Sequence, residues 1–84
     1  MKLQIQWTGD NLKEVIAFVG GSCIYKWFKS FDEYEQYVHN HDNIFKLFID
    51  SWKYYEIQQG CWLEKDDNSP ARPITEGKFK IRMR

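Results

Sequence analysis

The chain has 84 residues and carries 12 basic and 12 acidic side chains, so its net charge is zero. This length fits one domain over residues 1–84, and the balanced charge disfavours a protein that binds nucleic acid through overall basicity. No apolar run approaches the roughly 20 residues that a membrane-spanning helix needs, and the N-terminus lacks the apolar stretch of a signal peptide. We therefore expect a cytosolic protein that does not enter a membrane.

The charges are unevenly distributed along the chain. Residues 1–70 hold seven Lys and Arg against eleven Asp and Glu, whereas residues 71–84 hold five against one. The molecule is therefore expected to have an acidic body and a basic C-terminal segment. Its two cysteines, Cys23 and Cys61, are too few for a secreted disulfide scaffold, and we expect both to be free thiols.

The first predicted elements are a strand and a helix. Residues 2–8 alternate between apolar and polar side chains, as in a half-buried strand. Residues 12–19 carry apolar side chains at helical spacing, and two glycines follow as a stop signal. Asn11 and Glu14 have the spacing of a capping box, which predicts that the Asn11 side chain caps this helix.

A second helix is predicted within residues 30–41. Ser30 and Glu33 again have the spacing of a capping box. Acidic side chains occupy the first turn, where the helix dipole favours them, and give the helix an acidic outer face. Its buried face is expected to carry Phe31, Tyr34 and Val38.

The C-terminal half predicts strands. Residues 43–50, 51–57 and 61–65 are rich in aromatic and β-branched side chains and are separated by short turns, which is typical of an antiparallel meander. Residues 66–73 combine Asp, Asn, Ser and two prolines, and predict a loop. Residues 77–84 alternate between apolar and basic side chains, and predict a last strand.

These elements together predict an α+β fold. Two short helices are expected to pack on one face of a four- to five-stranded, mostly antiparallel sheet, in the order β-α-α-β-β-β-β. Within the strand after Gly60, Cys61 and Leu63 share one face and Trp62 lies on the other. We therefore expect Cys61 to be a small buried side chain and the Trp62 indole to be exposed.

Four segments resemble, in the same order, a group of small prophage and phage proteins of unknown function: WTGDNLKEVIAFVG, WFKSFDEYEQYV, IFKLF and EIQQGCWLEKD. Those proteins begin with a Trp/Tyr-x-Gly-x-Asn-Leu-x-Glu-Val-x-x-Phe stretch and end with a Gly-Asp-Trp/Tyr-Ile-x-Lys hairpin. The resemblance covers roughly residues 7–65. It implies a phage or mobile-element origin and a setting in the host cytosol, but it implies no activity. This chain departs from the group at Cys61, where an Asp is usual, and in its basic C-terminal segment, where a short helix is usual.

No motif in the sequence predicts catalysis or metal binding. A reactive thiol needs a base and electropositive surroundings, whereas the two histidines, His39 and His41, follow an acidic helix. One pair of histidines is only half of a zinc motif, and we interpret it as a solvated helix end. The sequence holds no nucleophile elbow, phosphate-binding loop or His-Glu-x-x-His motif. We therefore expect no enzyme and no cofactor.

The aromatic side chains exceed what a small core can hide, so some rings are expected at the surface. Exposed rings beside cations can stack on bases and hold phosphates, or form the centre of a protein interface. The predicted ligand-binding residues are Trp27, Trp52, Lys53, Tyr54, Trp62, Arg72, Lys80 and Arg82. The basic C-terminal strand has a second interpretation, as an edge strand whose cations discourage edge-to-edge pairing.

The leading hypothesis, from the resemblance and the lack of catalytic motifs, is a phage-type anti-defence protein without enzymatic activity. It would sequester a nucleotide-type immune signal in a pocket or at the interface of a homo-oligomer. One alternative is an inhibitor of a host defence nuclease or sensor that presents the acidic helix near Asp32, Glu33 and Glu35 as a mimic of nucleic acid. The other alternative is a phage regulatory or accessory protein without a role in defence.

Overall fold

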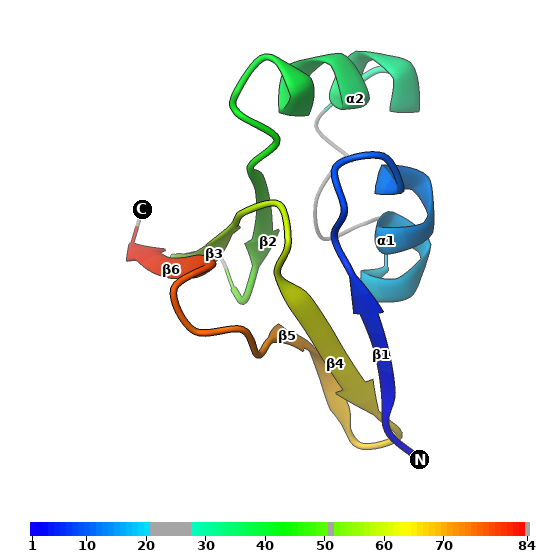
Figure 1. Cartoon of the computed structure of the whole chain (residues 1–84), viewed down its shortest axis with the longest axis vertical. Helices are drawn as coiled ribbons and strands as arrows, with labels where there is room; N and C mark the ends of the chain where they lie inside the picture. The colour runs from blue at the N-terminus through cyan, green and yellow to red at the C-terminus, as the bar shows by residue number, and fades with distance from the viewer. Residues whose placement is uncertain (21–27, 51, 84) are drawn as a thin grey trace.

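The computed structural model describes residues 1–20, 28–50 and 52–83 (Figure 1). Within these ranges it has two helices, α1 (Leu12–Val19) and α2 (Phe31–His39), and six strands. The strands are β1 (Leu3–Gln6), β2 (Phe45–Phe48), β3 (Lys53–Ile57), β4 (Trp62–Asp66), β5 (Ser69–Pro73) and β6 (Phe79–Met83). The predicted α+β class is confirmed.

The strands form two antiparallel three-stranded sheets, and the prediction of a single sheet is therefore wrong. Sheet A has the order β1-β4-β5, and sheet B has the order β2-β3-β6. α1 packs against β1 and β5 of sheet A, whereas α2 lies at one end of the molecule, beyond β2 (Figure 1). The two helices consequently do not share one face of one sheet. Neither helix is long and apolar enough to cross a membrane, and the described residues contain no other helix.

The predicted meander through β2, β3 and β4 is wrong at its second turn. Gly60 has a φ of 98°, a conformation that favours glycine, and its N–H donates to the carbonyl of Trp7 at 2.6 Å. The Trp7 N–H in turn donates to the carbonyl of Cys61 at 2.9 Å. These hydrogen bonds lie directly beside the antiparallel ladder between β4 and β1, in which Ile5 lies opposite Leu63. β4 therefore leaves sheet B, and β6 pairs with β3 in its place.

The predicted loop over residues 66–73 is largely a strand. Asp67 and Asn68 form a tight turn, which the Asp66 carboxylate supports by accepting the Asn68 N–H at 2.9 Å. The chain then returns along β4 as β5, at the edge of sheet A. Two prolines, Pro70 and Pro73, lie in β5. An edge strand tolerates proline because half of its backbone groups have no strand partner to lose.

The helix boundaries agree with the sequence, but only one of the two predicted caps forms. In α2 the Ser30 hydroxyl accepts the Glu33 N–H at 3.2 Å, which confirms this cap. Before α1, the Asn11 side chain makes no capping bond. Its amide oxygen accepts the Thr8 N–H at 3.0 Å, and its amide nitrogen donates to the Gln6 carbonyl at 2.8 Å. Asn11 thus fixes the turn between β1 and α1 instead of the helix end.

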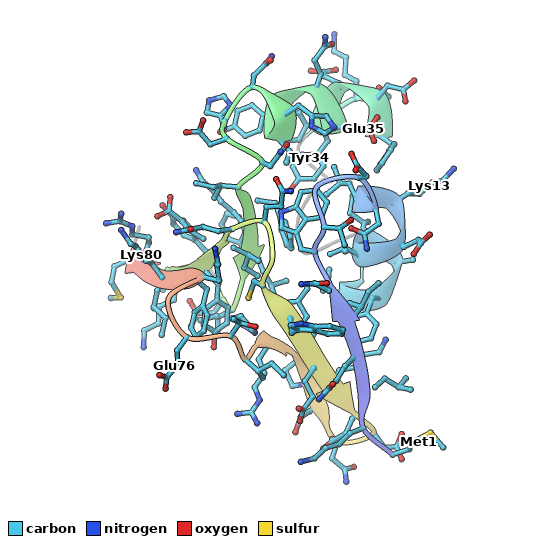
Figure 2. All side chains as sticks on the ribbon, viewed as in Figure 1. Met1, Lys13, Tyr34, Glu35, Glu76 and Lys80 are labelled. Atoms are coloured by element: carbon cyan, nitrogen blue, oxygen red, sulfur yellow. The ribbon has the colours of Figure 1, made fainter. Side chains whose placement is uncertain are left out.

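The core joins both helices to both sheets. Trp7 is fully buried, its indole N–H donates to the Asn43 carbonyl at 2.7 Å, and its ring meets Phe45 edge to face. Tyr34 points from α2 into the body of the molecule (Figure 2). Cys61 is buried and Trp62 is 42% exposed, as the alternation predicted. The buried apolar residues are Trp7, Leu12, Val15, Ile16, Tyr34, Val38, Phe45, Leu47, Ile57, Cys61 and Leu63.

Candidate functional site

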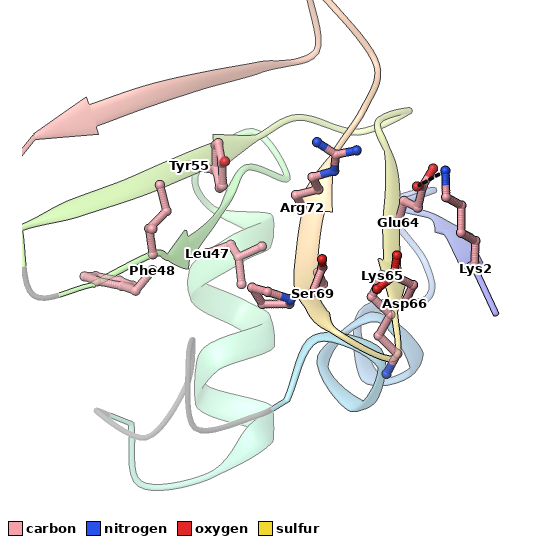
Figure 3. Close-up of a pocket in the computed structure, with 12 residues that line it drawn as sticks. Lys2, Leu47, Phe48, Tyr55, Glu64, Lys65, Asp66, Ser69 and Arg72 are labelled. Atoms are coloured by element: carbon pink, nitrogen blue, oxygen red, sulfur yellow. Dashed lines mark ion pairs between the residues drawn. The ribbon is translucent and has the colours of Figure 1, made fainter.

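A cavity of about 480 Å³ opens between the two sheets (Figure 3). This volume lies within the range of roughly 300–1,000 Å³ that is usual for small-molecule sites. Leu47, Phe48, Ile49 and Tyr55 line it from the side of sheet B. The opposite wall comes from β4, β5 and Lys2. The cavity thus depends on both sheets and has an apolar and a polar wall.

The apolar wall continues the core into the cavity. Leu47, Tyr55 and Ile81 are neighbours in one row across β2, β3 and β6. Leu47 is buried, and the half-buried Tyr55 ring packs edge to face on Phe79, with the ring centroids 5.8 Å apart. The contact with Phe79 and packing against the core fix the Tyr55 ring as a flat apolar surface beside the cavity.

The polar wall has one cation that is free to bind a ligand. Glu64 accepts a hydrogen bond from the Gln4 amide at 3.1 Å and pairs with the Lys2 ammonium at 3.6 Å. Lys65 turns its ammonium toward α1, where it donates to the Phe18 carbonyl at 2.7 Å. Arg72 is exposed and makes no hydrogen bond or ion pair within residues 1–20, 28–50 and 52–83. Its guanidinium is therefore available.

The outer face of sheet B, opposite to Leu47 and Tyr55, is basic and aromatic. Two cross-strand rows form it, Lys46-Glu56-Lys80 and Phe48-Tyr54-Arg82. The Phe48 and Tyr54 rings stack with their centroids 5.4 Å apart. The Arg82 guanidinium donates to Glu56 at 2.6 Å, and this hydrogen bond raises the pKa of Arg82 above its usual value. One of the three cations is thus already neutralised by Glu56.

No family model, curated protein or solved structure is significantly similar to this chain. We therefore infer the function from the cavity and the exposed faces of the molecule. The resemblance to phage proteins has no support beyond the four sequence segments.

The predicted ligand-binding residues do not meet in one site. Tyr54, Lys80 and Arg82 lie together on the outer face of sheet B. Arg72 lines the cavity, and it shares with Trp62 the face of sheet A opposite to Leu63.

Two further predicted residues lie near the β2-β3 turn. Trp52 is 68% exposed, and Lys53 lies opposite Met83 at the open end of sheet B. Trp27 is outside the described residues. The predicted residues in the described ranges therefore lie in three places: the outer face of sheet B, the face of sheet A opposite to Leu63, and the β2-β3 turn with the first residue of β3.

Several residues of the cavity were not predicted from the sequence. Tyr55 is the most important, because Tyr54 and Tyr55 are adjacent and the pattern alone does not say which ring faces a site. Lys2, which precedes β1, and Glu64, which lies in β4, are far apart in the sequence. The alternation of β3 was the one signal that could have identified Tyr55, once the buried side of Ile57 was known.

Cys61 forms no hydrogen bond with either histidine. Cys61 is buried, burial raises the pKa of its thiol, and its Sγ donates to the Trp62 carbonyl at 3.4 Å. His39 Nδ1 lies 2.7 Å from the Asn43 amide oxygen, and His41 Nδ1 lies 2.7 Å from the Tyr37 carbonyl. No group of three or more metal-binding side chains occurs within the described ranges. The arrangement of the cavity suits binding of a ligand by shape, charge and stacking.

Proposed function

We propose that this protein is a non-enzymatic binding protein that holds a small anionic ligand with a planar ring, of the nucleotide type, in the cavity between the sheets. The main support is the placement of Arg72 and Tyr55 on opposite walls of that cavity (Figure 3). Arg72 supplies a cation without a partner among the described residues, and Tyr55 supplies a fixed aromatic surface.

The two walls would recognise the two parts of such a ligand. A guanidinium donates two parallel hydrogen bonds to a phosphate, and the low dielectric beside the apolar wall strengthens them. A base or another planar ring would pack on Tyr55 and Leu47. Glu64 repels an anion only weakly because Lys2 pairs with it.

The charge of the cavity favours a ligand with few phosphates. Among the described residues, Arg72 is the one cation of the cavity without a hydrogen bond or an ion pair, because Lys2 pairs with Glu64 and Lys65 donates to the Phe18 carbonyl. Asp66 adds a carboxylate to the lining. A second or third phosphate would find no further free cation there and would approach Asp66. We therefore expect a monophosphate or a cyclic nucleotide to bind more tightly than the corresponding triphosphate.

The biological setting rests on the resemblance to phage proteins. In a phage-infected cell, a protein that binds such a ligand tightly would act by removing a nucleotide-type immune signal from the host cytosol. Anti-defence sequestration is therefore the role that we propose, and it needs no catalytic residue.

The acidic face of α2 supports a second candidate function. Asp32 and Glu33 are exposed in the first turn of α2, and Glu35 is half-buried. None of the three takes part in an ion pair among the described residues. A row of carboxylates without cations is a suitable surface for a basic nuclease or sensor.

Native mass spectrometry with linear and cyclic nucleotides tests the proposal. Arg72→Gln is expected to weaken binding roughly ten- to hundredfold, because a hydrogen bond to a charged group contributes about 1.5–3 kcal/mol. Arg82→Gln removes the same charge outside the cavity and is the matched control, with affinity unchanged. Equal losses in both variants would move the site to the outer face of sheet B. Retention of no nucleotide at all would favour the acidic face of α2.

A further inference from the structure

We propose that the free edge of β6 is a docking site for an extended segment of a partner protein in which acidic and apolar side chains alternate. The segment would add to sheet B as a fourth strand, beside Phe79–Met83. This surface is separate from Arg72, and the inference is independent of the nucleotide ligand proposed above.

The backbone of β6 presents hydrogen-bonding groups to solvent. The Gln58 N–H donates to the Lys78 carbonyl at 2.9 Å, and the next pair along the ladder is Ile57 with Phe79. In an antiparallel ladder, residues that exchange backbone bonds alternate with residues that do not. Lys80 and Arg82 therefore turn their backbone groups toward β3.

It follows that Phe79, Ile81 and Met83 turn their N–H and C=O groups away from β3. β6 is the last strand of sheet B, and none of these groups has a partner in the part of the chain that the structure describes. Such an edge is a template for another strand. The edge of β5 is a poorer template, because Pro70 and Pro73 have no N–H to donate.

The side chains of β6 define which strand fits. On the face that continues toward the cavity, Ile81 is 58% exposed and Met83 is 67% exposed. On the outer face, Lys80 makes no ion pair with a described residue, and the one ion pair of Arg82 among these residues is with Glu56. A strand with apolar residues opposite Ile81 and carboxylates opposite Lys80 and Arg82 would satisfy both faces.

A second copy of this chain does not fit the same edge. When two β6 strands pair antiparallel through their free edges, the outward-facing backbone groups must meet. If the two strands overlap fully, Lys80 of one copy lies opposite Arg82 of the other. Like charges directly opposite each other destabilise a strand pair. The cations therefore both discourage self-pairing and select an acidic partner.

The test uses synthetic peptides and the intact protein. A labelled heptapeptide, Glu-Val-Glu-Ile-Glu-Val-Glu, is expected to bind, while the version with Lys in place of Glu and a version with all Glu residues grouped at one end are expected to bind at least roughly tenfold more weakly. In the bound strand the N–H of the central Ile points toward β6, so methylating that nitrogen removes binding. Methylating the nitrogen of a neighbouring Glu, which points away, leaves binding intact.

Amide hydrogen exchange locates the peptide on the protein. The N–H groups of Phe79, Ile81 and Met83 are expected to exchange more slowly when the peptide binds, whereas those of Lys80 and Arg82, already turned toward β3, are expected to change little.

A charge reversal on β6 provides the second measurement. Lys80→Glu is expected to weaken binding at least roughly tenfold. The matched control is Lys13→Glu on α1, which lies on the other side of the molecule and keeps full affinity (Figure 2). Absence of binding, equal binding of the two methylated peptides, or protection outside β6 would each overturn the proposal.

Discussion

Trp7 is the residue whose substitution tests the packing most sharply. Its fully buried indole joins β1 to the segment before β2 through the 2.7 Å hydrogen bond from its N–H to the carbonyl of Asn43. Its ring also packs edge to face on Phe45, with the centroids 5.5 Å apart. Trp7→Phe keeps an aromatic ring but removes the donor and part of the buried volume.

The expected cost has two parts. A carbonyl that loses its hydrogen-bond partner inside a protein costs about 1–3 kcal/mol. The smaller ring gives up buried apolar surface and leaves unfilled space, which costs about another 1–2 kcal/mol. The sum, about 2–5 kcal/mol, is a large fraction of the 5–15 kcal/mol that is usual for the free energy of unfolding.

Urea unfolding followed by far-ultraviolet circular dichroism measures this cost without relying on tryptophan fluorescence. Trp52→Phe makes the same chemical change at a side chain that is 68% exposed, and it is expected to change the free energy of unfolding by less than about 0.5 kcal/mol. If Trp7→Phe were as mild as Trp52→Phe, the assigned role of the Trp7 indole in holding β1 to the core would be refuted.

Two further predictions concern turns. Gly9 and Gly20 both have positive φ values, but only at Gly9 would a Cβ lie 2.8 Å from the Gln59 side chain, which accepts a hydrogen bond from Asn43. Gly9→Ala is therefore expected to cost about 0.5–1.5 kcal/mol more than Gly20→Ala in urea unfolding, and equal costs would contradict the contact. Hydrogen bonds from the N–H groups of Trp52 and Lys53 lower the pKa of Asp50. The carboxylate thus stabilises the fold above the usual pKa of Asp, and this stabilisation is lost as the pH falls through the lowered value. Asp50→Asn is expected to show a smaller loss of stability from about pH 7 to about pH 3, and an unchanged loss would argue against this turn.

Local patterns in the sequence were sufficient for the elements that depend on local chemistry. The bounds of α1 follow from apolar spacing and the glycine after Val19, and the start of α2 follows from Ser30. The alternation around Trp62 correctly predicted that its neighbours are buried and that its own indole is exposed. Asn11 was misassigned because its side chain can bond equally well to the preceding turn, and only the position of Gln6 decides between them.

The pairing of strands was not readable from the sequence. The short turns after β2 and after β3 looked alike, yet only the first joins two paired strands, β2 and β3. β4 pairs with β1, which is distant in the sequence, and so belongs to the other sheet. Proline in β5 suggested a loop, and only the edge position of that strand explains why it is tolerated. The cavity follows from these distant pairings, so composition could point to Arg72 but not to its position opposite Tyr55.

The measurement that tests the proposed ligand site most directly is nuclear magnetic resonance of the protein during titration with adenosine monophosphate. We predict that the largest shift changes occur at the cavity, in Leu47, Tyr55, Ala71 and Arg72, and that Arg72→Gln removes them. Changes confined to Tyr54, Lys80 and Arg82 on the outer face of sheet B, or no changes at a concentration that saturates typical nucleotide sites, would contradict the proposal.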